Sequence, residues 1–256
     1  MLFEDIIFGP IKSRRLGTSL GVNVLPIEKK YCNFNCVYCE CGWNEISSQE
    51  KVSLNNKQEI LKALEEKLIC LEKENIELDS ITFAGNGEPT IHPEFKEIVE
   101  GVVALRNKFC TKAKITVLSN ATNLLKENVF SALQKVDNPI LKLDAGREEM
   151  FYNISKADSH VIDFEKVKER LIAFGEKAII QTLLIRGENE GKRIDNTSDE
   201  EFEAWLEIIK EINPRYVMLY PIDRVTPESK LEKLSKQEIE LFAERVRAIG
   251  IEAKAY

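Results

Sequence analysis

The sequence has little histidine, no long apolar run and no excess of basic charge. Its two histidines, His92 and His160, have no metal-ligand neighbours at useful spacing, so we expect both to be structural. No apolar stretch is long enough to span a bilayer, and Glu4 and Asp5 stand where a signal peptide would be basic. The formal net charge of −7 excludes a global basic field of the kind that attracts nucleic acid. We therefore expect a globular, cytoplasmic protein without a membrane partner.

Cysteine is also scarce, but its distribution is uneven. Of the six cysteines, four lie within ten residues, namely Cys32, Cys36, Cys39 and Cys41. Thiols stay reduced in the cytoplasm, so a cluster of them indicates metal or redox chemistry more than disulfide bonds. The other two, Cys70 and Cys110, fall in expected helices and are interpreted as small buried hydrophobic residues.

Short apolar runs rich in β-branched residues alternate along the chain with longer amphipathic segments. The expected strands cover 19–26, 80–85, 114–120, 139–146, 178–187 and 215–224, and the final "GIEAKAY" is a further candidate. The expected helices cover 56–75, 92–109, 124–136, 164–177, 199–212 and 235–249. Nearly continuous apolar strands are typical of parallel sheets, and β-α alternation implies right-handed crossovers. The sequence therefore predicts one α/β domain over 1–256, either a doubly wound sheet or an open barrel.

Capping residues refine the helix boundaries. Asn55, Ser198 and Ser235 are expected to cap the helices that follow them, because their side chains can accept from free backbone N–H groups. Gly250 is expected to end the last helix, since glycine readily adopts the left-handed conformation found there.

The unusual residues follow the expected strands. The second to sixth strands end in "GNGEPT" (85–90), "SNAT" (119–122), "KLDAG" (142–146), "IRGENEG" (185–191) and "YPIDR" (220–224). Turn formation alone explains glycine, asparagine and aspartate at any one of these places. In parallel α/β folds, however, functional sites form at the carboxyl ends of strands, and the thiol cluster follows the first strand.

The spacing C-x3-C-x2-C of Cys32, Cys36 and Cys39 is open to three interpretations. The thiols could share one face of a helix, but Asn33 and Asn35 disfavour a helix. They could bind structural zinc with Cys41 as the fourth ligand, although such sites usually pair two separated ligand pairs. They could instead hold an iron–sulfur cluster through three thiolates, which leaves one iron open for a substrate.

The stretch "CNFNCVYC" resembles the C-x3-C-x-aromatic-C signature of the radical S-adenosylmethionine (SAM) superfamily, with Tyr38 as the aromatic residue. "GNGEPT" stands where that family carries a Gly-Gly-Glu motif, and the six β-α units are similar to its partial (β/α)6 TIM-type barrel, open on one side. Together, "FGPIKSRRLGTSLGVN" and "CNFNCVYCE" resemble small wyosine-base synthase-like iron–sulfur oxidoreductases, whose substrate is unassigned.

The resemblance implies an enzyme with two cofactors. Cys32, Cys36 and Cys39 would ligate a 4Fe–4S cluster, and SAM would bind its open iron. Reductive cleavage of SAM would give a 5′-deoxyadenosyl radical that abstracts hydrogen from an unknown substrate. The electron would come from a reductant protein such as flavodoxin or ferredoxin.

The same resemblance assigns SAM contacts around the glycine motif. Gly85 and Gly87 would let the backbone approach the methionine amino group, although Asn86 replaces one glycine of the family motif and could itself supply that contact. Glu88 would accept a hydrogen bond from the ammonium; the alternative is a solvated carboxylate at the rim. Tyr38 would pack near the adenine, or else fill the core.

Further polar residues are candidates at the other strand ends. By resemblance, Ser119 and Asn120 are expected to contact the ribose hydroxyls, unless they are plain turn residues. Gln181 is a polar residue within an apolar strand and needs a partner if it is buried.

Four charged residues are catalytic candidates. Lys142 and Asp144 point the same way on one strand; facing the interior, they would form an ion pair or touch the SAM carboxylate. Arg14 and Arg15 could clamp a carboxylate or phosphate, or simply stabilise their loop.

Two features bear on the substrate. No second cysteine set is present, whereas wyosine-base synthases carry one near the N-terminus, which argues against transfer of that tRNA-modifying activity. A barrel open on one side could admit a protein, a peptide or an RNA segment, and the acidic net charge disfavours RNA. The alternative from another class is a non-catalytic module that binds zinc or an iron–sulfur cluster.

Overall fold

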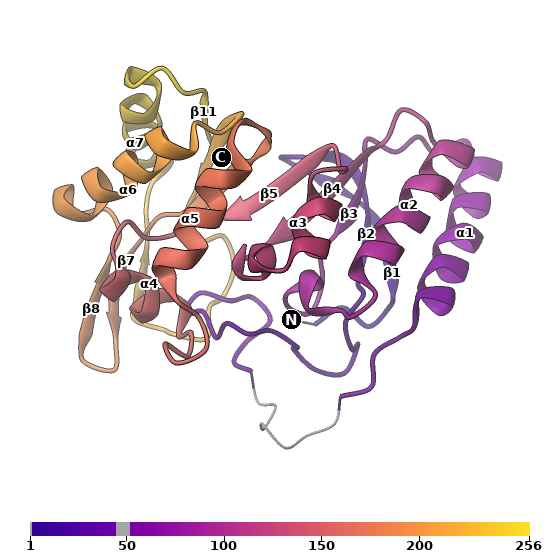
Figure 1. Cartoon of the computed structure of the whole chain (residues 1–256), viewed down its shortest axis with the longest axis horizontal. Coiled ribbons are helices and arrows are strands. Elements are labelled where there is room, and N and C mark those ends of the chain that lie inside the picture. Colours follow the sequence, from indigo (N-terminus) through magenta and orange to yellow (C-terminus); the bar gives the residue numbers. More distant parts are fainter. Residues whose placement is uncertain (1, 45–51) are drawn as a thin grey trace. The chain divides into compact units, whose positions relative to one another are not determined.

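The computed structural model describes residues 2–44 and 52–256. The chain divides into two compact units (Figure 1). Unit 1 takes the described residues of 1–32, 44–119 and 126–139, and unit 2 takes residues 33–43, 120–125 and 140–256. The cysteine stretch is therefore shared, with Cys32 in unit 1 and the residues from Asn33 to Trp43 in unit 2.

The strands of unit 1 are β1 (Ile7–Ser13), β2 (Gly17–Val22), β3 (Ser80–Phe83) and β4 (Lys114–Ser119), in that spatial order. β2, β3 and β4 are parallel, with Leu20, Ile81 and Ile115 in register, as expected. β1 is not an expected element. It pairs antiparallel with β2 as an edge strand, and its half-exposed residues lack the apolar run that marks the buried strands.

The helices of unit 1 lie beside its strands (Figure 1), and they are α1 (Lys57–Lys73), α2 (Phe95–Phe109) and α3 (Glu127–Leu133). The expected cap of α1 is wrong by one residue, because Asn56 and not Asn55 forms a capping box with Glu59. α2 begins later than expected because Pro89–Ile91 form a separate 3₁₀ turn, η1.

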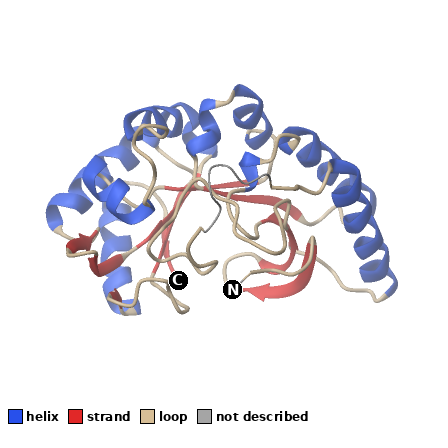
Figure 2. Cartoon of the chain, turned by 90° about the horizontal axis from the view of Figure 1, so that it is seen from below, coloured by secondary structure: helices blue, strands red, loops and turns tan. Residues whose placement is uncertain are grey.

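The main strands of unit 2 are β5 (Asn138–Lys142), β6 (Ile179–Leu183), β9 (Tyr216–Tyr220) and β11 (Ala253–Ala255), all parallel. β11 confirms the strand expected in "GIEAKAY". The helices are α4 (Glu148–Ser155), α5 (Phe164–Phe174), α6 (Asp199–Ile212) and α7 (Lys236–Ala248), of which α4 is not an expected element. In each unit the helices flank the strands (Figure 2), which confirms the α/β class.

Two of the expected helix ends in unit 2 are confirmed. The Ser235 hydroxyl accepts from Glu238 N in a capping box at the start of α7. Gly250 follows α7 with φ of +85°, as expected of a glycine after a helix. Ser198 is the N-cap of α6, but its side chain makes no capping hydrogen bond.

A second, antiparallel sheet in unit 2 corrects the expected strand over 178–187. That run ends as β6 at Leu183, and β7 (Ile185–Asn189) pairs with β8 (Lys192–Asp195) and β10 (Leu231–Lys233) in the order β10-β7-β8. The direction changes where Ile185 N donates to Asn196 Oδ1 at 2.8 Å. One face of this sheet packs Ile185 and Ile194 against Val37 of the cysteine stretch.

Within residues 2–44 and 52–256, no helix is both long and apolar enough to cross a bilayer.

Candidate functional site

The turn after β3 is built on two glycines and packs against the residue before Cys32. Gly85 and Gly87 have φ of +153° and +145°, which other residues rarely adopt. A Cβ on Gly87 would lie 1.9 Å from Tyr31 O, so only glycine fits. Tyr31 N donates to Asn86 O at 2.7 Å and Glu88 N donates to Tyr31 O at 3.2 Å. The glycine motif thus fixes the backbone that leads into the first thiol.

Asn86, which stands in place of a family glycine, is fully buried and holds unit 1 together. Its Nδ2 donates to Phe3 O and Pro26 O, both at 2.9 Å, and its Oδ1 accepts from Phe3 N at 2.8 Å. These bonds engage both ends of the amide. The side chain therefore braces two distant stretches of backbone around the turn.

Glu88 is buried with only 2% of its surface exposed, so it is not a solvated carboxylate at the rim. Its Oε1 accepts from Thr90 N at 3.0 Å, from the Thr90 hydroxyl, and from Ser119 Oγ at 2.9 Å. These three donors are neutral. They fix the direction of Oε1, and a buried carboxylate oriented in this way can accept a hydrogen bond from a cation.

The thiols of the cysteine stretch form no disulfide bonds and are partly exposed. No helix spans residues 33–43, which removes the shared helix face as an explanation. Among the described residues, no three His, Cys, Asp or Glu side chains converge to hold a single metal ion. A 4Fe–4S cluster has a different requirement, because each thiolate binds a different iron atom. Three partly exposed thiols on an irregular loop fit such a cluster by their chemistry and spacing.

The residues between the cysteines anchor the loop in unit 2. Asn35 N donates to Ser155 O at 2.8 Å, Val37 N donates to Ile154 O at 3.0 Å, and Glu228 N donates to Val37 O at 3.3 Å. The Val37 side chain is fully buried. The loop is thus fixed through its intervening residues, and Cys36 and Cys39 are left partly exposed.

Asn120 also contacts this loop. Asn120 Nδ2 donates to Asn33 Oδ1 at 2.8 Å, Asn33 Nδ2 donates to Thr122 Oγ1 at 2.7 Å, and Thr122 Oγ1 donates to Asn120 Oδ1 at 2.7 Å. The three side chains form a closed ring of hydrogen bonds. Asn120 therefore supports the loop, whatever else it contacts.

A polar cluster surrounds Tyr38. Its hydroxyl donates to Asp144 Oδ2, and Lys142 Nζ lies 3.3 Å from the same oxygen and 2.7 Å from the Tyr220 hydroxyl. The predicted pairing of Lys142 with Asp144 is present. Burial alone would lower the pKa of Lys142, but the Asp144 carboxylate and Tyr220 outweigh it and raise that pKa. Burial, reinforced by Asp144, raises the pKa of Tyr38 well above its usual value.

Three further candidates have different surroundings. Gln181 is buried on β6, in register with Lys142 on β5, so it belongs to the same part of unit 2. Arg14 and Arg15 lie in the exposed turn between β1 and β2. That turn precedes β2, and the glycine motif follows β3. Because β2 and β3 are parallel, the turn and the motif lie at opposite ends of these strands. Within unit 1, these two arginines therefore lie away from the glycine motif.

Supporting residues that sequence reasoning missed lie around Asp144. Asn196 Nδ2 donates to Asp144 O at 2.8 Å, and Gly146 N donates to Glu201 Oε1 at 2.6 Å. Glu201 is fully buried, although its place in the acidic first turn of α6 is typical of a solvated residue. No sequence pattern distinguishes these residues, because their role depends on distant backbone groups.

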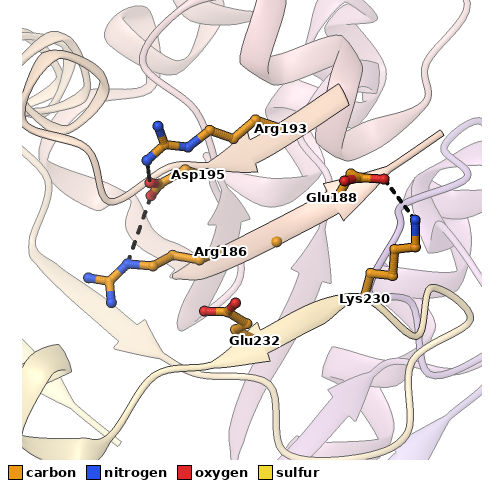
Figure 3. A pocket seen from close by; sticks show the side chains of 7 residues that line it. Arg186, Glu188, Arg193, Asp195, Lys230 and Glu232 are labelled. Carbon is orange, nitrogen blue, oxygen red and sulfur yellow. Dashed lines mark hydrogen bonds and ion pairs between the residues drawn. The ribbon is translucent and has the colours of Figure 1, made fainter. Parts of the chain in front are cut away.

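A hollow of about 420 Å³ lies over the outer face of the sheet β10-β7-β8 (Figure 3). Its lining alternates in charge: Arg193 is bonded to Asp195 at 2.6 Å, and Lys230 to Glu188 at 2.7 Å. The first pair lies within β8, and the second joins β7 to the residue before β10. Because the charges pair with one another, the hollow is not the candidate site.

The comparisons with known proteins decide the family. Residues 30–199 match the radical SAM superfamily, a range that includes the cysteine loop, the glycine motif and the residues Tyr38, Lys142 and Asp144. The chain belongs to the radical SAM superfamily. Enzymes of this superfamily use a 4Fe–4S cluster and SAM, so the protein is an enzyme that uses these cofactors.

Curated relatives add a second, less informative affiliation. The chain is 32% identical to a UPF0026 protein of Helicobacter pylori over 91% of its own length and 71% of the relative, so it also belongs to the UPF0026 group. It is 32% identical to a protein named GTPase Obg from Brachyspira hyodysenteriae, again over 91% of this chain. The chain spans only 32% of that relative.

Solved radical SAM structures show the same fold at low identity. A methyltransferase from Sphaerobacter thermophilus matches with a TM-score of 0.69 and 16% identity, over 93% of this chain and 65% of its own. TYW1 with a lysine–pyruvate adduct matches with a TM-score of 0.62 and 16% identity, over 91% of this chain and 75% of its own. SuiB of Streptococcus suis bound to SAM matches with a TM-score of 0.61 and 16% identity, over 92% of this chain and 50% of its own. The predicted partial TIM-type barrel, with a sheet that does not close, is thereby confirmed.

Proposed function

We propose that Cys32, Cys36 and Cys39 hold the 4Fe–4S cluster of this radical SAM enzyme. When bound, the cluster and SAM supply reductive cleavage of SAM to a 5′-deoxyadenosyl radical, which abstracts hydrogen from the substrate. The observation that carries the proposal is the cysteine loop. Its intervening residues are bonded to α4 and to the segment at Glu228, and its thiols are partly exposed and not tied up in disulfide bonds.

The glycine motif is proposed to receive the methionine end of SAM. Gly85 and Gly87 present backbone without side chains, and Glu88 is held in place to accept from the ammonium. Asn86 serves this region as a brace, because both ends of its amide are bonded to backbone of unit 1. Ser119 acts through Glu88, to which its hydroxyl donates.

The remaining proposed SAM contacts come from unit 2. Tyr38 is proposed to pack near the adenine, and Asn120 and Gln181 to line the nucleoside end. Lys142 and Asp144 are bonded to each other and to tyrosines. We therefore propose that these two residues shape the site and do not transfer protons.

The proposed partners follow from the chemistry. A cluster that must be reduced requires an electron donor, such as a flavodoxin or ferredoxin, and a reducing cytoplasm would keep the three thiols available. The substrate stays open among a protein, a peptide and an RNA. A SuiB structure contains its precursor peptide, which favours the peptide class as the first to be tested. The acidic net charge of −7 disfavours RNA.

Anaerobic reconstitution of the full chain with iron and sulfide tests the proposal. We expect a brown protein that, with a chemical reductant, converts SAM to 5′-deoxyadenosine. A colourless protein that holds one zinc ion and leaves SAM intact would overturn it.

Single cysteine variants test the ligand assignment. Cys32→Ala, Cys36→Ala and Cys39→Ala should each abolish 5′-deoxyadenosine formation, because a missing thiolate leaves one iron without its protein ligand. Cys41→Ala is the matched control, since it removes a neighbouring thiol that is not in a disulfide bond. An equal loss in Cys41→Ala would show that the three ligands are wrongly chosen.

A further inference from the structure

The residue between the second and third thiols is held on two sides. Tyr38 lies between Cys36 and Cys39, and its hydroxyl donates to Asp144 Oδ2. The Lys142 ammonium lies 5.1 Å from the centre of the Tyr38 ring and 5.1 Å from that of Tyr220. A cation at this distance is attracted to an aromatic face. The ring is thus fixed by its edge hydroxyl and by its face.

The Asp144 carboxylate that receives Tyr38 is itself immobilised. Its Oδ1 accepts from Leu183 N at 2.8 Å, and its backbone oxygen accepts from Asn196 Nδ2, also at 2.8 Å. Gly146, two residues after Asp144, packs closely against α6: a Cβ on Gly146 would lie 2.2 Å from Trp205 N. The segment of Asp144 is therefore held against β6 and α6, and Asp144 in turn holds Tyr38 of the cysteine loop.

Burying the ion pair of Lys142 and Asp144 also costs desolvation free energy. The side chains of Lys142 and Asp144 are only 20% and 12% exposed, and desolvation offsets much of the attraction within a buried ion pair. Such a pair is weak support for stability alone, and specifying one geometry is its better-attested use. Here the geometry that it specifies is that of Tyr38.

We propose that Asp144, with Lys142, is a positioning residue for the cluster loop: it holds Tyr38 so that Cys36 and Cys39 keep the separation that two iron atoms of the cluster require. This inference rests on the proposed function and deepens it. The inference does not require the Asp144 or Lys142 side chain to touch SAM or substrate.

Iron release provides the test. The full chain would be reconstituted anaerobically as wild type, Tyr38→Phe, Asp144→Asn and the double variant, and exposed to an iron chelator. Losing one hydrogen bond to a charged group should speed iron release by about tenfold in each single variant. Because both substitutions break the same bond, the double variant should be no faster than the faster single variant.

A control separates this role from general stability. Asp137 accepts from Arg106 at 3.1 Å and from Ile115 N at 2.8 Å in unit 1, so Asp137→Asn breaks a comparable partly buried pair. It should leave iron release unchanged. The electron paramagnetic resonance spectrum of the reduced cluster should change in Tyr38→Phe and Asp144→Asn, and not in Asp137→Asn.

Each outcome has a distinct meaning. Unchanged release and spectra in Tyr38→Phe, additive effects in the double variant, or equal acceleration in Asp137→Asn would overturn the inference. If Asp144→Asn does not fold, Tyr38→Phe still decides, because it keeps the ring and removes only the hydroxyl. A wild-type protein that binds no cluster would instead contradict the proposed function.

Discussion

Two carboxylates, one in each unit, accept hydrogen bonds from different kinds of donor. Glu88 of unit 1 accepts at Oε1 from a backbone N–H and two hydroxyls, all of them neutral and two of them from the next residue but one, Thr90. Asp144 of unit 2 accepts from a tyrosine hydroxyl and a backbone N–H, and it forms an ion pair with Lys142.

The difference separates a binding group from a structural one. Neutral donors fix the direction of a carboxylate oxygen and add no positive charge beside it. An ammonium at 3.3 Å cancels the negative charge of a carboxylate within the protein. Glu88 is accordingly proposed to bind the SAM ammonium, and Asp144 to hold the cluster loop.

The largest expected effect comes from the turn that carries Glu88. Gly87→Ala places a Cβ 1.9 Å from Tyr31 O at a φ of +145°. Strain and overlap together should lower the free energy of unfolding by about 3 kcal/mol or more. Gly191→Ala is the matched control, since Gly191 also has positive φ and a Cβ there meets nothing within 4 Å. Urea unfolding of both apoproteins checks this, and equal losses would contradict the close contact.

Asn86→Ala should have the next largest effect. It removes the partners of Phe3 N, Phe3 O and Pro26 O around the turn. Buried groups left without partners should lower the free energy of unfolding by about 2–3 kcal/mol. SAM affinity, measured below the unfolding transition, should persist. Unchanged stability with lost SAM affinity would show that Asn86 is a ligand contact and not a brace.

Glu88→Gln tests the charge itself. The amide can keep the hydrogen bonds from Thr90 and Ser119 while it removes the negative charge. Losing a charge-assisted bond should weaken SAM binding by about 10–100-fold. Equilibrium dialysis of the reconstituted protein, normalised to its iron content, measures this. Asp144→Asn should weaken SAM binding less, and an equal loss in both variants would remove the distinction between the two carboxylates.

The smallest expected effect concerns a third, solvent-facing carboxylate. Bonds from Ser235 and from Arg186 lower the pKa of Glu238 from 4.5 to about 2. A lowered pKa in the folded state stabilises the fold above pH 4.5, and this contribution is lost as pH falls towards 2. Glu238→Gln should therefore flatten the decline of unfolding free energy over this range. An unchanged slope in acid denaturation would show that the cap contributes nothing.

The sequence predicts best those elements in which apolar residues recur at a regular helical spacing. The sequence predicts a helix over 199–212, and α6 is observed as Asp199–Ile212, because its apolar residues recur with the period of a helix. Leu183, Leu184 and Ile185 show the opposite case. Their unbroken apolar run hides the change from β6 to β7, which depends on a hydrogen bond from Ile185 N to the distant Asn196.

The site divides in the same way. Short-range spacing and family resemblance single out the cysteines, Glu88 and the pairing of Lys142 with Asp144. Neither indicates that Asn86 bonds to Phe3, 83 residues away in sequence, or that Asn196 and Glu201 support the loop after β5. Such roles are decided by which remote backbone groups need a partner, and no local pattern records that need.

The binding of Val37 at both its backbone N–H and its C=O has a practical consequence. Its amide lies between two of the proposed iron ligands, is bonded to Ile154 O, and belongs to a fully buried residue. Its exchange with deuterium therefore requires the loop to detach from α4. The protection of this one amide reports whether the loop is assembled, and it does so before any iron is added.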